Sequence, residues 1–392
     1  MLPQFEFSLP TTILFGNGML QKAGENLKAL GKSCFLVTGR HSVDKAGYLK
    51  TLTDQLDANK ITYVHFNKIS PNPKSTEVDT AAEMIRAGKF DMVVALGGGS
   101  VMDASKAIAM LAKNPGNIWD YMYKGPGKKF KRFNTALPIV MIPTLAATGS
   151  EVNSGAVISN PETKEKSVFF GEALYPTASI IDPQLTWSVP YNSTVDGAVD
   201  IICHVLEMYL STNEDDFLQD QLALAIIKTT KRCLDIIKND LKNSEARAQM
   251  FWASSLALSG FVNDGRHGNF PMHAIEHALS GHCDKLSHGR GLGTILIQTL
   301  EFDKGALPDK LKDLSRYVFD KDVPTVDAAI KLWKEWLTYH GTGNSLKEYI
   351  GDIAPRVLAE QILCFSGTPD FLPNVRNFTK NDLVEFIKMI SK

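Results

Sequence analysis

The first half of the chain alternates short apolar runs with segments of helical spacing, and this alternation limits the possible folds more than any other feature. The apolar runs cover 33–39, 62–67, 90–100, 137–144 and 178–182. Helical stretches follow at about 43–58, 75–88 and 100–113. Strands that alternate with helices form parallel βαβ units. We therefore predict an α/β domain with a parallel sheet.

The second half has a different pattern. From about 193 onward, apolar residues recur at helical spacing, as in the long stretches 219–239 and 244–262. The chain has 392 residues, too many for one ordinary core. We predict an α/β dinucleotide-binding domain over 1–190 and an all-helical domain for metal and substrate over 191–392. The active site should lie in the cleft between them.

Composition excludes several classes of protein. A net charge of -1 gives no basic excess for nucleic acid. Five scattered cysteines without a CxxC pair indicate reduced thiols and a cytoplasmic protein. The opening MLPQFEFSLP lacks the basic and apolar regions of a signal peptide. No run approaches the ~18 apolar residues of a transmembrane helix, so we expect no membrane partner.

A glycine run, Gly97 to Gly99, follows the third apolar strand and precedes Ser100, which can cap the next helix. Glycines allow close approach of a ligand, and a helix N-terminus attracts phosphate. The spacing is neither GxGxxG nor a Walker A loop. The alternative is a tight strand-to-helix turn. Asp103, one turn into the helix, either reaches a cofactor or serves only the helix dipole.

The loop PTLAATGSE, at 143–151, also follows a strand. Its hydroxyl residues Thr144 and Thr148 suit a nicotinamide or a ribose. Taken alone, an ordinary turn explains the loop better.

Histidines and carboxylates cluster in the helical half. Asp200 and His204 stand four residues apart, and four of the nine histidines lie at 273, 277, 282 and 288. Side chains one helical turn apart can point at one spot, so one oxygen and up to three nitrogens can converge on a divalent transition metal. The alternative is a hydrogen-bonding pair on a helix surface. Asp196 is a rival carboxylate, and Glu207 is expected to support a ligand or to pack.

Several motifs together resemble a known family. They are GGGSVMDASKAIA, PTLAATGSE, the D-x3-H-x2-E-x-Y pattern from Asp200 to Tyr209, and H-x3-H followed by HGRGLG. This combination resembles the iron-containing (group III) alcohol dehydrogenases, and most of all their bacterial butanol dehydrogenase and aldehyde reductase branch. The resemblance implies a Rossmann-like N-terminal domain and an all-helical C-terminal domain. It also implies hydride transfer between NAD(P)H and a small alcohol/aldehyde pair, and a homodimer.

The resemblance further implies a role for individual residues. The implied metal ligands are Asp200, His204, His273 and His288, with His277 beside the site. The implied cofactor contacts are Gly97, Gly98, Gly99, Ser100, Asp103, Thr144, Leu145, Thr148 and Lys166. His273 to His288 spans fifteen residues, whereas the family has fourteen. His282 or Cys283 could therefore take part in the metal site.

The implied chemistry assigns catalytic roles to Asp200 and His204 through the metal and to His277 as a route for the proton. A carboxylate with three imidazoles suits Fe(II), and Zn or Ni could also occupy such a site. The alternatives are a lyase of the dehydroquinate synthase type and a catalytically silent nucleotide-binding homologue. The lyase needs basic residues for a phosphorylated acid, and the histidine-rich segment has no such cluster.

The first strand ends in Gly39, Arg40, His41 and Ser42, without the carboxylate that often binds the ribose 2′-OH of NAD. Arg40 could pair with the 2′-phosphate of NADP, and Ser42 could add a hydrogen bond. We therefore predict NADP as the preferred cofactor, with NAD also possible. In the alternative, Arg40 points to solvent.

Overall fold

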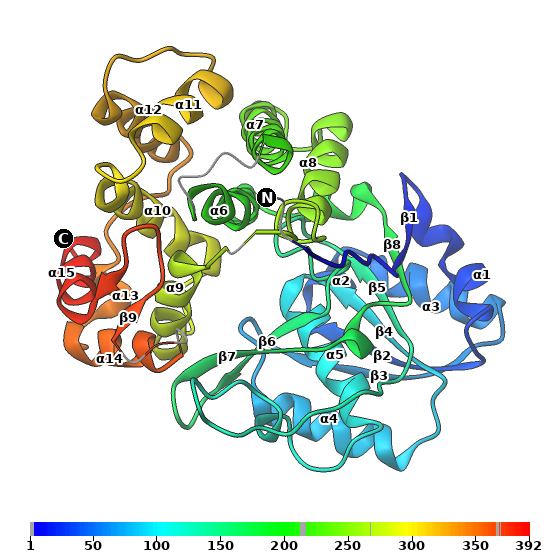
Figure 1. Ribbon diagram of the computed structural model, residues 1–392. Coiled ribbons are helices and arrows are strands. Elements are labelled where there is room, and N and C mark those ends of the chain that lie inside the picture. Colours follow the sequence, from blue (N-terminus) through cyan, green and yellow to red (C-terminus); the bar gives the residue numbers. More distant parts are fainter. Residues whose placement is uncertain (1–3, 212–216, 267, 366–367, 369) are drawn as a thin grey trace.

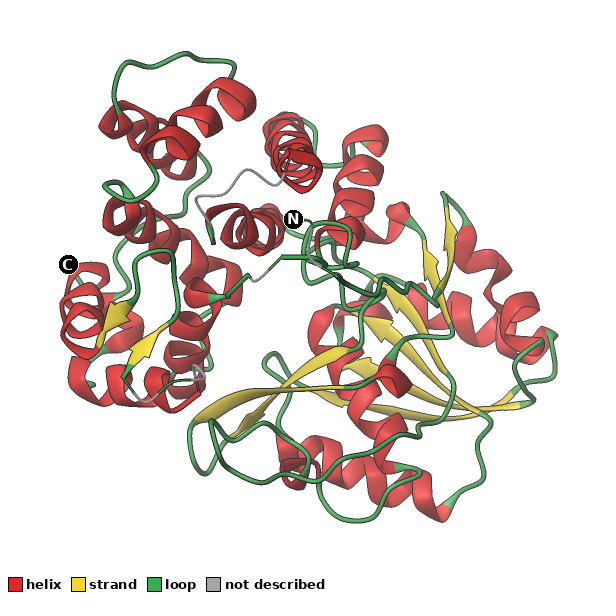
Figure 2. Cartoon of the chain, viewed as in Figure 1, coloured by secondary structure: helices red, strands yellow, loops and turns green. Residues whose placement is uncertain are grey.

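The computed structural model describes residues 4–211, 217–266, 268–365, 368 and 370–392. An α/β half and a helical half lie side by side (Figures 1 and 2). The strands of the α/β half lie between Thr12 and Ile181, and the first long helix of the helical half is α6 (Tyr191–Leu210). The two-part architecture predicted from the sequence is confirmed.

The α/β half is built on a six-stranded sheet in the order β1-β8-β5-β4-β2-β3, in which all pairs are parallel. Parallel sheets have both faces covered, and their strands are apolar throughout. The inner strands accordingly consist almost entirely of buried residues. The six strands are β1 (Thr12–Phe15), β2 (Ser33–Gly39), β3 (Thr62–Ile69), β4 (Met92–Gly97), β5 (Ile139–Pro143) and β8 (Ala178–Ile181).

Helices cover both faces of this sheet. Phe35 and Val37 of β2 belong to the core beneath α4 and α5, whereas Cys34 and Leu36 belong to the core beneath α1 and α3. The helical segments of this half are η1 (Met19–Lys22), α1 (Ala23–Lys28), α2 (Ser42–Lys45), α3 (Tyr48–Ala58), α4 (Ser75–Ala87), α5 (Gly99–Leu111), η2 (Ile118–Asp120), η3 (Glu172–Leu174) and η4 (Pro183–Ser188). The single helix expected over 43–58 is two helices, because Gly47 takes a left-handed φ of 78° between them.

Strands β6 (Gly155–Asn160) and β7 (Glu165–Phe170) form an antiparallel hairpin that was not predicted from the sequence. It extends from the α/β half toward the helical half, where β7 packs against α9 (Figure 1). The hairpin turn uses Lys164 at a left-handed φ of 59°. This hairpin carries Lys166 to the boundary between the halves.

The helical half surrounds α6, whose residues from Gly197 to Leu210 are all buried. A two-residue strand pair, β9 with β10, interrupts the expected all-helical pattern. The elements are α6, α7 (Phe217–Asn239), α8 (Ser244–Ala257), α9 (Pro271–His282), α10 (His288–Asp303), α11 (Pro308–Phe319), α12 (Val326–Tyr339), α13 (Lys347–Ile350), α14 (Pro355–Phe365), β9 (Phe371–Leu372), β10 (Phe378–Thr379) and α15 (Lys380–Ile390).

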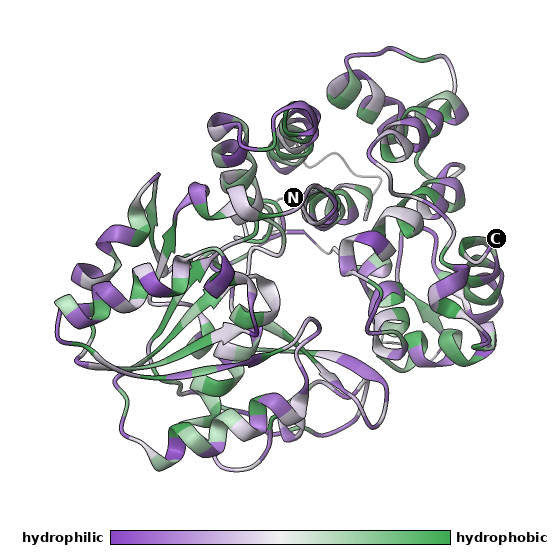
Figure 3. Ribbon diagram, turned by 180° about the vertical axis from the view of Figure 1, so that it is seen from behind, coloured by the Kyte–Doolittle hydropathy of each residue, from purple (hydrophilic) through white to green (hydrophobic). Residues whose placement is uncertain are grey.

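Hydropathy follows this architecture: apolar residues run along the sheet strands, and the outer helices alternate polar with apolar residues (Figure 3). Among the described residues, no helix combines the length and the apolar character needed to span a bilayer.

Candidate metal site and cofactor cleft

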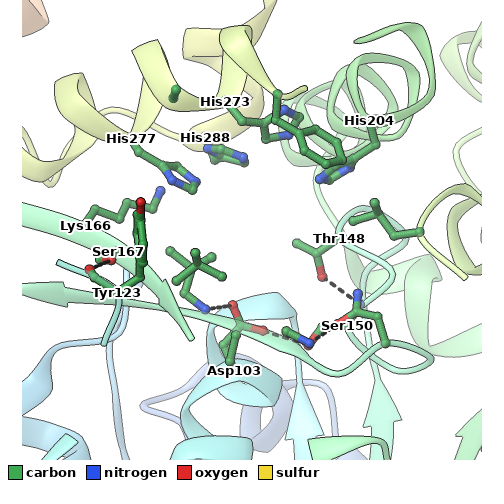
Figure 4. Close-up of a pocket in the computed structure, with 18 of the residues that line it drawn as sticks. Asp103, Tyr123, Thr148, Ser150, Lys166, Ser167, His204, His273, His277 and His288 are labelled. Atoms are coloured by element: carbon green, nitrogen blue, oxygen red, sulfur yellow. Dashed lines mark hydrogen bonds between the residues drawn. The ribbon is translucent and has the colours of Figure 1, made fainter. Parts of the chain in front are cut away.

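A cavity of about 630 Å³ lies between the two halves. Its walls come from the start of α5, the β6–β7 hairpin, α6, α9, the start of α10 and α14. In Figure 4, the four labelled histidines lie on one side of the cavity, and Asp103, Thr148 and Ser150 lie on the opposite side. Residues expected to bind a metal therefore face residues expected to bind a cofactor.

Asp200 and His204 lie on one face of α6, as their four-residue spacing predicts. His204 Nδ1 is 3.4 Å from Asp200 Oδ1. His273, on α9, brings its Nε2 to 3.5 Å from the same oxygen, and its ring stacks on His204 with centroids 4.3 Å apart. These three residues offer ligand atoms that all lie within 4.8 Å of one another.

His288 is the first residue of α10, and its Nε2 lies 3.5 Å from Asp200 Oδ1. The following residue explains this close approach. A Cβ on Gly289 would lie 1.9 Å from the backbone oxygen of Asp196 on α6. Only glycine lets α10 begin so close to α6, and His288 is thereby brought to Asp200.

The positions of the carboxylate and imidazole atoms and their lack of hydrogen-bond partners fit a bound metal. Asp200 Oδ1, His204 Nδ1 and His273 Nε2 are buried and have no hydrogen-bond partner among the described residues. Buried polar atoms without partners are costly unless something binds them. Ligand atoms around a tetrahedral divalent ion with bonds of about 2.1 Å lie about 3.4 Å apart. The distances from the three histidine nitrogens to Asp200 Oδ1 match this separation.

Two buried glutamates support the histidines from behind. Glu207, on α6, accepts hydrogen bonds from His273 Nδ1 and from the backbone N–H groups of Met272 and His273. The same carboxylate thus caps the start of α9 and also fixes the orientation of the His273 ring. Glu276 accepts a hydrogen bond from His288 Nδ1 in the same manner. Each imidazole is left with its Nε2 facing Asp200.

The electrostatics of the cluster are governed by burial and by mutual attraction. Burial lowers the pKa of His204 to about 3, so this imidazole is neutral. Burial alone would raise the pKa of Asp200, but His204 and His288 hold it well below its usual range. Burial would lower the pKa of His273, yet Glu207 and Asp200 raise it to about 10. A metal and a proton therefore compete for His273 Nε2.

The rival ligands lie elsewhere. Asp196 pairs with Arg290 at 3.1 Å and accepts a hydrogen bond from Ser287. His282 is the last residue of α9, and its Nε2 contacts Gln361 Oε1 at 2.7 Å. Cys283 packs against the core of the helical half. None of the three belongs to the group around Asp200.

His277 lines the cavity one helical turn after His273. Its ring centroid lies 5.4 Å from that of His288. Burial, followed by the charges of Lys166 and His288, lowers the pKa of His277 well below its usual value. The lowered pKa keeps this imidazole neutral and makes it a weak base, so only its position at the cavity wall favours a role in proton exchange.

The glycine run meets the cavity at the start of α5. The helix begins at Gly99 with Gly98 as its cap, so Ser100 lies in the first turn and does not cap the helix. Gly99 and Ser100 line the cavity. A Cβ on Gly99 would lie 2.6 Å from Thr148 Cγ2, so the 143–151 loop packs directly on this turn. The helix N-terminus is thus open toward the cavity, as a phosphate group requires.

Asp103 and Lys166 also line the cavity, but both have protein partners. Asp103 accepts hydrogen bonds from Ser150 Oγ at 2.7 Å and from Val157 N at 2.9 Å, which tie α5 to the next loop and to the hairpin. Lys166 Nζ contacts Glu276, Ser280 and Asn72. Both side chains are thereby fixed at the cavity wall.

The remaining expected cofactor residues lie outside the cavity lining. Gly97 ends β4, and Thr144 N donates to its carbonyl oxygen. Leu145 packs over Gly98. Gly39 and Ser42 lie where β2 meets α2, and Arg40 between them forms a 3.4 Å ion pair with Glu77.

Three further residues at the site were not predicted from the sequence. Tyr123 and Asn72 line the cavity, and Glu276 contacts His288. The position of Glu276 directly before His277, within the histidine-rich segment, is a sequence signal from which it could have been predicted. Tyr123 and Asn72 come from loops without periodicity, and only the folded chain brings them there.

Two family models match nearly the whole chain. "Iron-containing alcohol dehydrogenase" matches residues 10–183, and "Fe-containing alcohol dehydrogenase family, C-terminal" matches residues 194–390. The gap between the two matches includes the start of α6.

Individual proteins with similar sequences or structures agree with these matches. NADH-dependent butanol dehydrogenase A of Clostridium acetobutylicum is 34% identical, and the match covers 98% of both chains. The NADPH-dependent aldehyde reductase YqhD of Escherichia coli is 30% identical over 88% of this chain and 89% of its own. The crystal structure of NADH-dependent butanol dehydrogenase A of Thermotoga maritima superposes with a TM-score of 0.92, at 31% identity, over 100% of this chain and 99% of that chain.

Proposed function

The chain belongs to the iron-containing alcohol dehydrogenase family, and we propose that it reduces short and medium aldehydes in the cavity between its two halves. It is an alcohol dehydrogenase or aldehyde reductase that uses a nicotinamide cofactor and iron. One observation carries the proposed site. Three histidine nitrogens surround Asp200 Oδ1 at 3.4, 3.5 and 3.5 Å, opposite the open start of α5.

We assign metal binding to Asp200, His204, His273 and His288. A divalent ion held by these residues would supply Lewis-acid polarisation of a carbonyl oxygen, and a nicotinamide cofactor would supply the hydride. The donor set suits Fe(II), and Zn or Ni are expected to bind as well.

The chain's own residues orient these groups. Glu207 and Glu276 fix the rings of His273 and His288. The N-terminus of α5, where Gly99 and Ser100 line the cavity, would hold the pyrophosphate of the cofactor. His277, neutral and at the cavity wall, exchanges the proton with substrate or water.

The lining of the cavity favours an uncharged substrate. Leu258, Phe270, Ile362 and Leu372 contribute apolar surface. Among the described lining residues no arginine occurs, and Lys166 is already paired with Glu276. A phosphorylated acid, as in a dehydroquinate synthase, would find no free cation here. Butanal and its neighbours in length are the substrates that we propose.

For the cofactor, we propose a preference for NADPH. The corner after β2 carries Gly39, Arg40 and Ser42 and no carboxylate of its own. Arg40 is 61% exposed in its ion pair with Glu77, and such pairs are worth about 0–1 kcal/mol. Arg40 can therefore exchange Glu77 for a 2′-phosphate. Relatives named for NADH and for NADPH both occur, so the family alone does not fix the preference.

We also propose that the protein is cytoplasmic, and that the two domains of each chain meet at Pro190 and Tyr191. We further propose that two chains form a homodimer. Strand β1 is an open sheet edge, and exposed aromatic residues lie beside it. Phe15 packs against Trp252 and Phe7 packs against Phe261, yet all four side chains are between 37% and 45% exposed. Exposed apolar patches of this kind mark interaction surfaces. Light scattering should give twice the monomer mass, and a monomer would contradict the proposal.

One assay tests the proposed function. The purified protein is loaded anaerobically with Fe²⁺, or with Zn²⁺, and butanal-dependent oxidation of NADPH and NADH is followed. We expect turnover that requires the metal. A protein that binds metal and cofactor but converts no aldehyde or alcohol would be a silent homologue, and the proposal would fail.

A further inference from the structure

Glu276 joins the two halves of the molecule through a buried chain of contacts. Its side chain is 0% exposed and lies on α9. Its Oε2 accepts a hydrogen bond from His288 Nδ1 and lies 3.4 Å from Lys166 Nζ. His288 belongs to the helical half, whereas Lys166 comes from the β6–β7 hairpin of the α/β half.

Lys166 is as firmly held as the glutamate. Its side chain is 6% exposed, and its Nζ donates to Ser280 Oγ at 3.0 Å and to Asn72 Oδ1 at 3.1 Å. An ammonium group has three donors, and together with Glu276 all three are used. Asn72 belongs to the α/β half and Ser280 to the helical half, so this ammonium bridges the boundary.

We propose that Glu276 is a positioning residue for His288, and that Lys166 holds Glu276 in place across the boundary between the halves. The metal site would then be complete only when the hairpin is docked on α9. This inference rests on the proposed function, in which His288 binds the metal.

The physical reason lies in the two nitrogens of the His288 ring. A carboxylate that accepts from Nδ1–H fixes the tautomer and the ring plane, and it leaves the Nε2 lone pair facing Asp200 Oδ1 at 3.5 Å. A buried carboxylate without a cation is costly. Lys166 provides that cation, so its removal should loosen Glu276 and, through it, His288.

Glu207 provides a matched comparison. It supports His273 as Glu276 supports His288, but it is anchored by the backbone N–H groups of Met272 and His273. All of these partners lie within the helical half. The position of Glu207 therefore does not depend on the hairpin.

A second metal between Glu276, His277 and His288 is the competing interpretation. Ligand atoms of these three residues lie within 4.8 Å of one another. The Lys166 ammonium, however, contacts the same carboxylate oxygen. A further cation at that point would be repelled, so the cluster is better explained as a support for His288.

The test measures binding of Co²⁺ to the metal-free protein by titration of the visible absorption bands, which report the ligand field. The first double-mutant cycle consists of Glu276→Gln, Lys166→Met and the variant that carries both. The matched control cycle consists of Glu207→Gln, Lys166→Met and the variant that carries both. We expect Glu276→Gln to weaken Co²⁺ binding about 10- to 100-fold and to shift the bands. Lys166→Met should weaken binding less. The double variant should be no weaker than Glu276→Gln, whereas Lys166→Met and Glu207→Gln should act additively.

The outcomes separate this inference from the proposed function. If His288→Ala loses Co²⁺ while Glu276→Gln keeps wild-type affinity and spectrum, the metal site stands and the inference is wrong. Additive losses for Glu276→Gln and Lys166→Met would also overturn it. If the wild type binds no Co²⁺, the metal assignment itself fails. Circular dichroism checks folding, and should Glu276→Gln not fold, unchanged affinity in Lys166→Met would refute the proposal.

Discussion

At the scale of single residues, two histidines six positions apart differ in whether they face the metal site. His288 Nε2 faces Asp200, whereas His282 Nε2 contacts Gln361 on α14. His288→Ala should therefore remove most bound metal and reduce aldehyde turnover at least about 100-fold. His282→Ala should keep both, because it loses only one hydrogen bond at the rim. Metal content by atomic emission, measured beside kcat/KM, checks the pair, and equal losses in both variants would contradict the assignment.

Under the proposed function, cofactor choice should depend on the corner of the sheet that carries Gly39 and Arg40. A Cβ on Gly39 would lie 3.6 Å from the nearest atom, so Gly39→Asp fits without strain. The new carboxylate should repel a 2′-phosphate and reverse the preference for NADPH. Arg40→Ala should reduce the preference by about 10- to 150-fold, corresponding to about 1.5–3 kcal/mol for a charged hydrogen bond. The ratio of kcat/KM for the two cofactors decides, and a wild-type ratio that favours NADH would show the prediction to be wrong.

Asp303, at the end of α10, should make stability depend on pH. Burial raises its pKa to about 7, so the folded chain keeps a proton that the unfolded chain releases above about 3.8. The contribution of this group to stability therefore falls as pH rises from about 4 to about 7 and stays constant above that. The amide side chain introduced by Asp303→Asn cannot ionise, and it can still accept a hydrogen bond from Asn374. The variant should therefore have a higher thermal midpoint than the wild type at pH 8, and the difference should be smaller at pH 5.

The expected gain from Asp303→Asn at pH 8 is on the order of 2–4 kcal/mol, at about 1.4 kcal/mol per pKa unit. Glu301→Gln, at a partly exposed position on the same helix, provides the control and should leave the pH dependence between pH 5 and pH 8 unchanged. A pH profile that is the same in Asp303→Asn as in the wild type would refute this account.

At the scale of elements, the site depends on how closely α10 approaches α6. Gly289→Ala would place a Cβ against the Asp196 backbone oxygen and push the helices apart. We expect a loss of about 1–3 kcal/mol in stability and weaker metal binding, because His288 moves with α10. Gly305→Ala is the control, since no atom lies within 4 Å of its added Cβ. Thermal midpoints and metal titrations of both variants provide the measurement.

The elements that the sequence predicted share a strong periodic signal. The strands β2, β4, β5 and β8 are apolar runs, β3 lies between two helical stretches, and α6 carries Asp200 and His204 at helical spacing. The β6–β7 hairpin was missed because GAVISN and EKSVFF are short and mix polar with apolar residues. Spacing and resemblance together suggested the ligand set. The contact between Glu276 and His288 could not be predicted, because it arises only when α9 and α10 pack together.

At the scale of the whole molecule, three helices converge on one point, and a metal bound there should stabilise the folded chain. Such a ligand contributes about 4 kcal/mol at a free concentration of 1,000 Kd. Removing the metal with a chelator should lower the thermal midpoint of the wild type. His204→Ala should show no such change, because its site no longer binds the ion. Differential scanning calorimetry with and without added Zn²⁺ measures the effect, and an equal shift in both proteins would contradict the assignment.

The order of the strands also governs how the chain is made. Among the described strands, β1 pairs only with β8, so Thr12–Phe15 must wait until Ala178–Ile181 have been synthesised. At about 5–20 residues per second, this interval is on the order of ten seconds. During that time the nascent sheet lacks two strands beyond β5, namely β8 and β1. Strand β1 therefore leaves the exit tunnel before the other five strands of this sheet and is the last of the six to pair, and Phe15 on it gains its partner Trp252 later still.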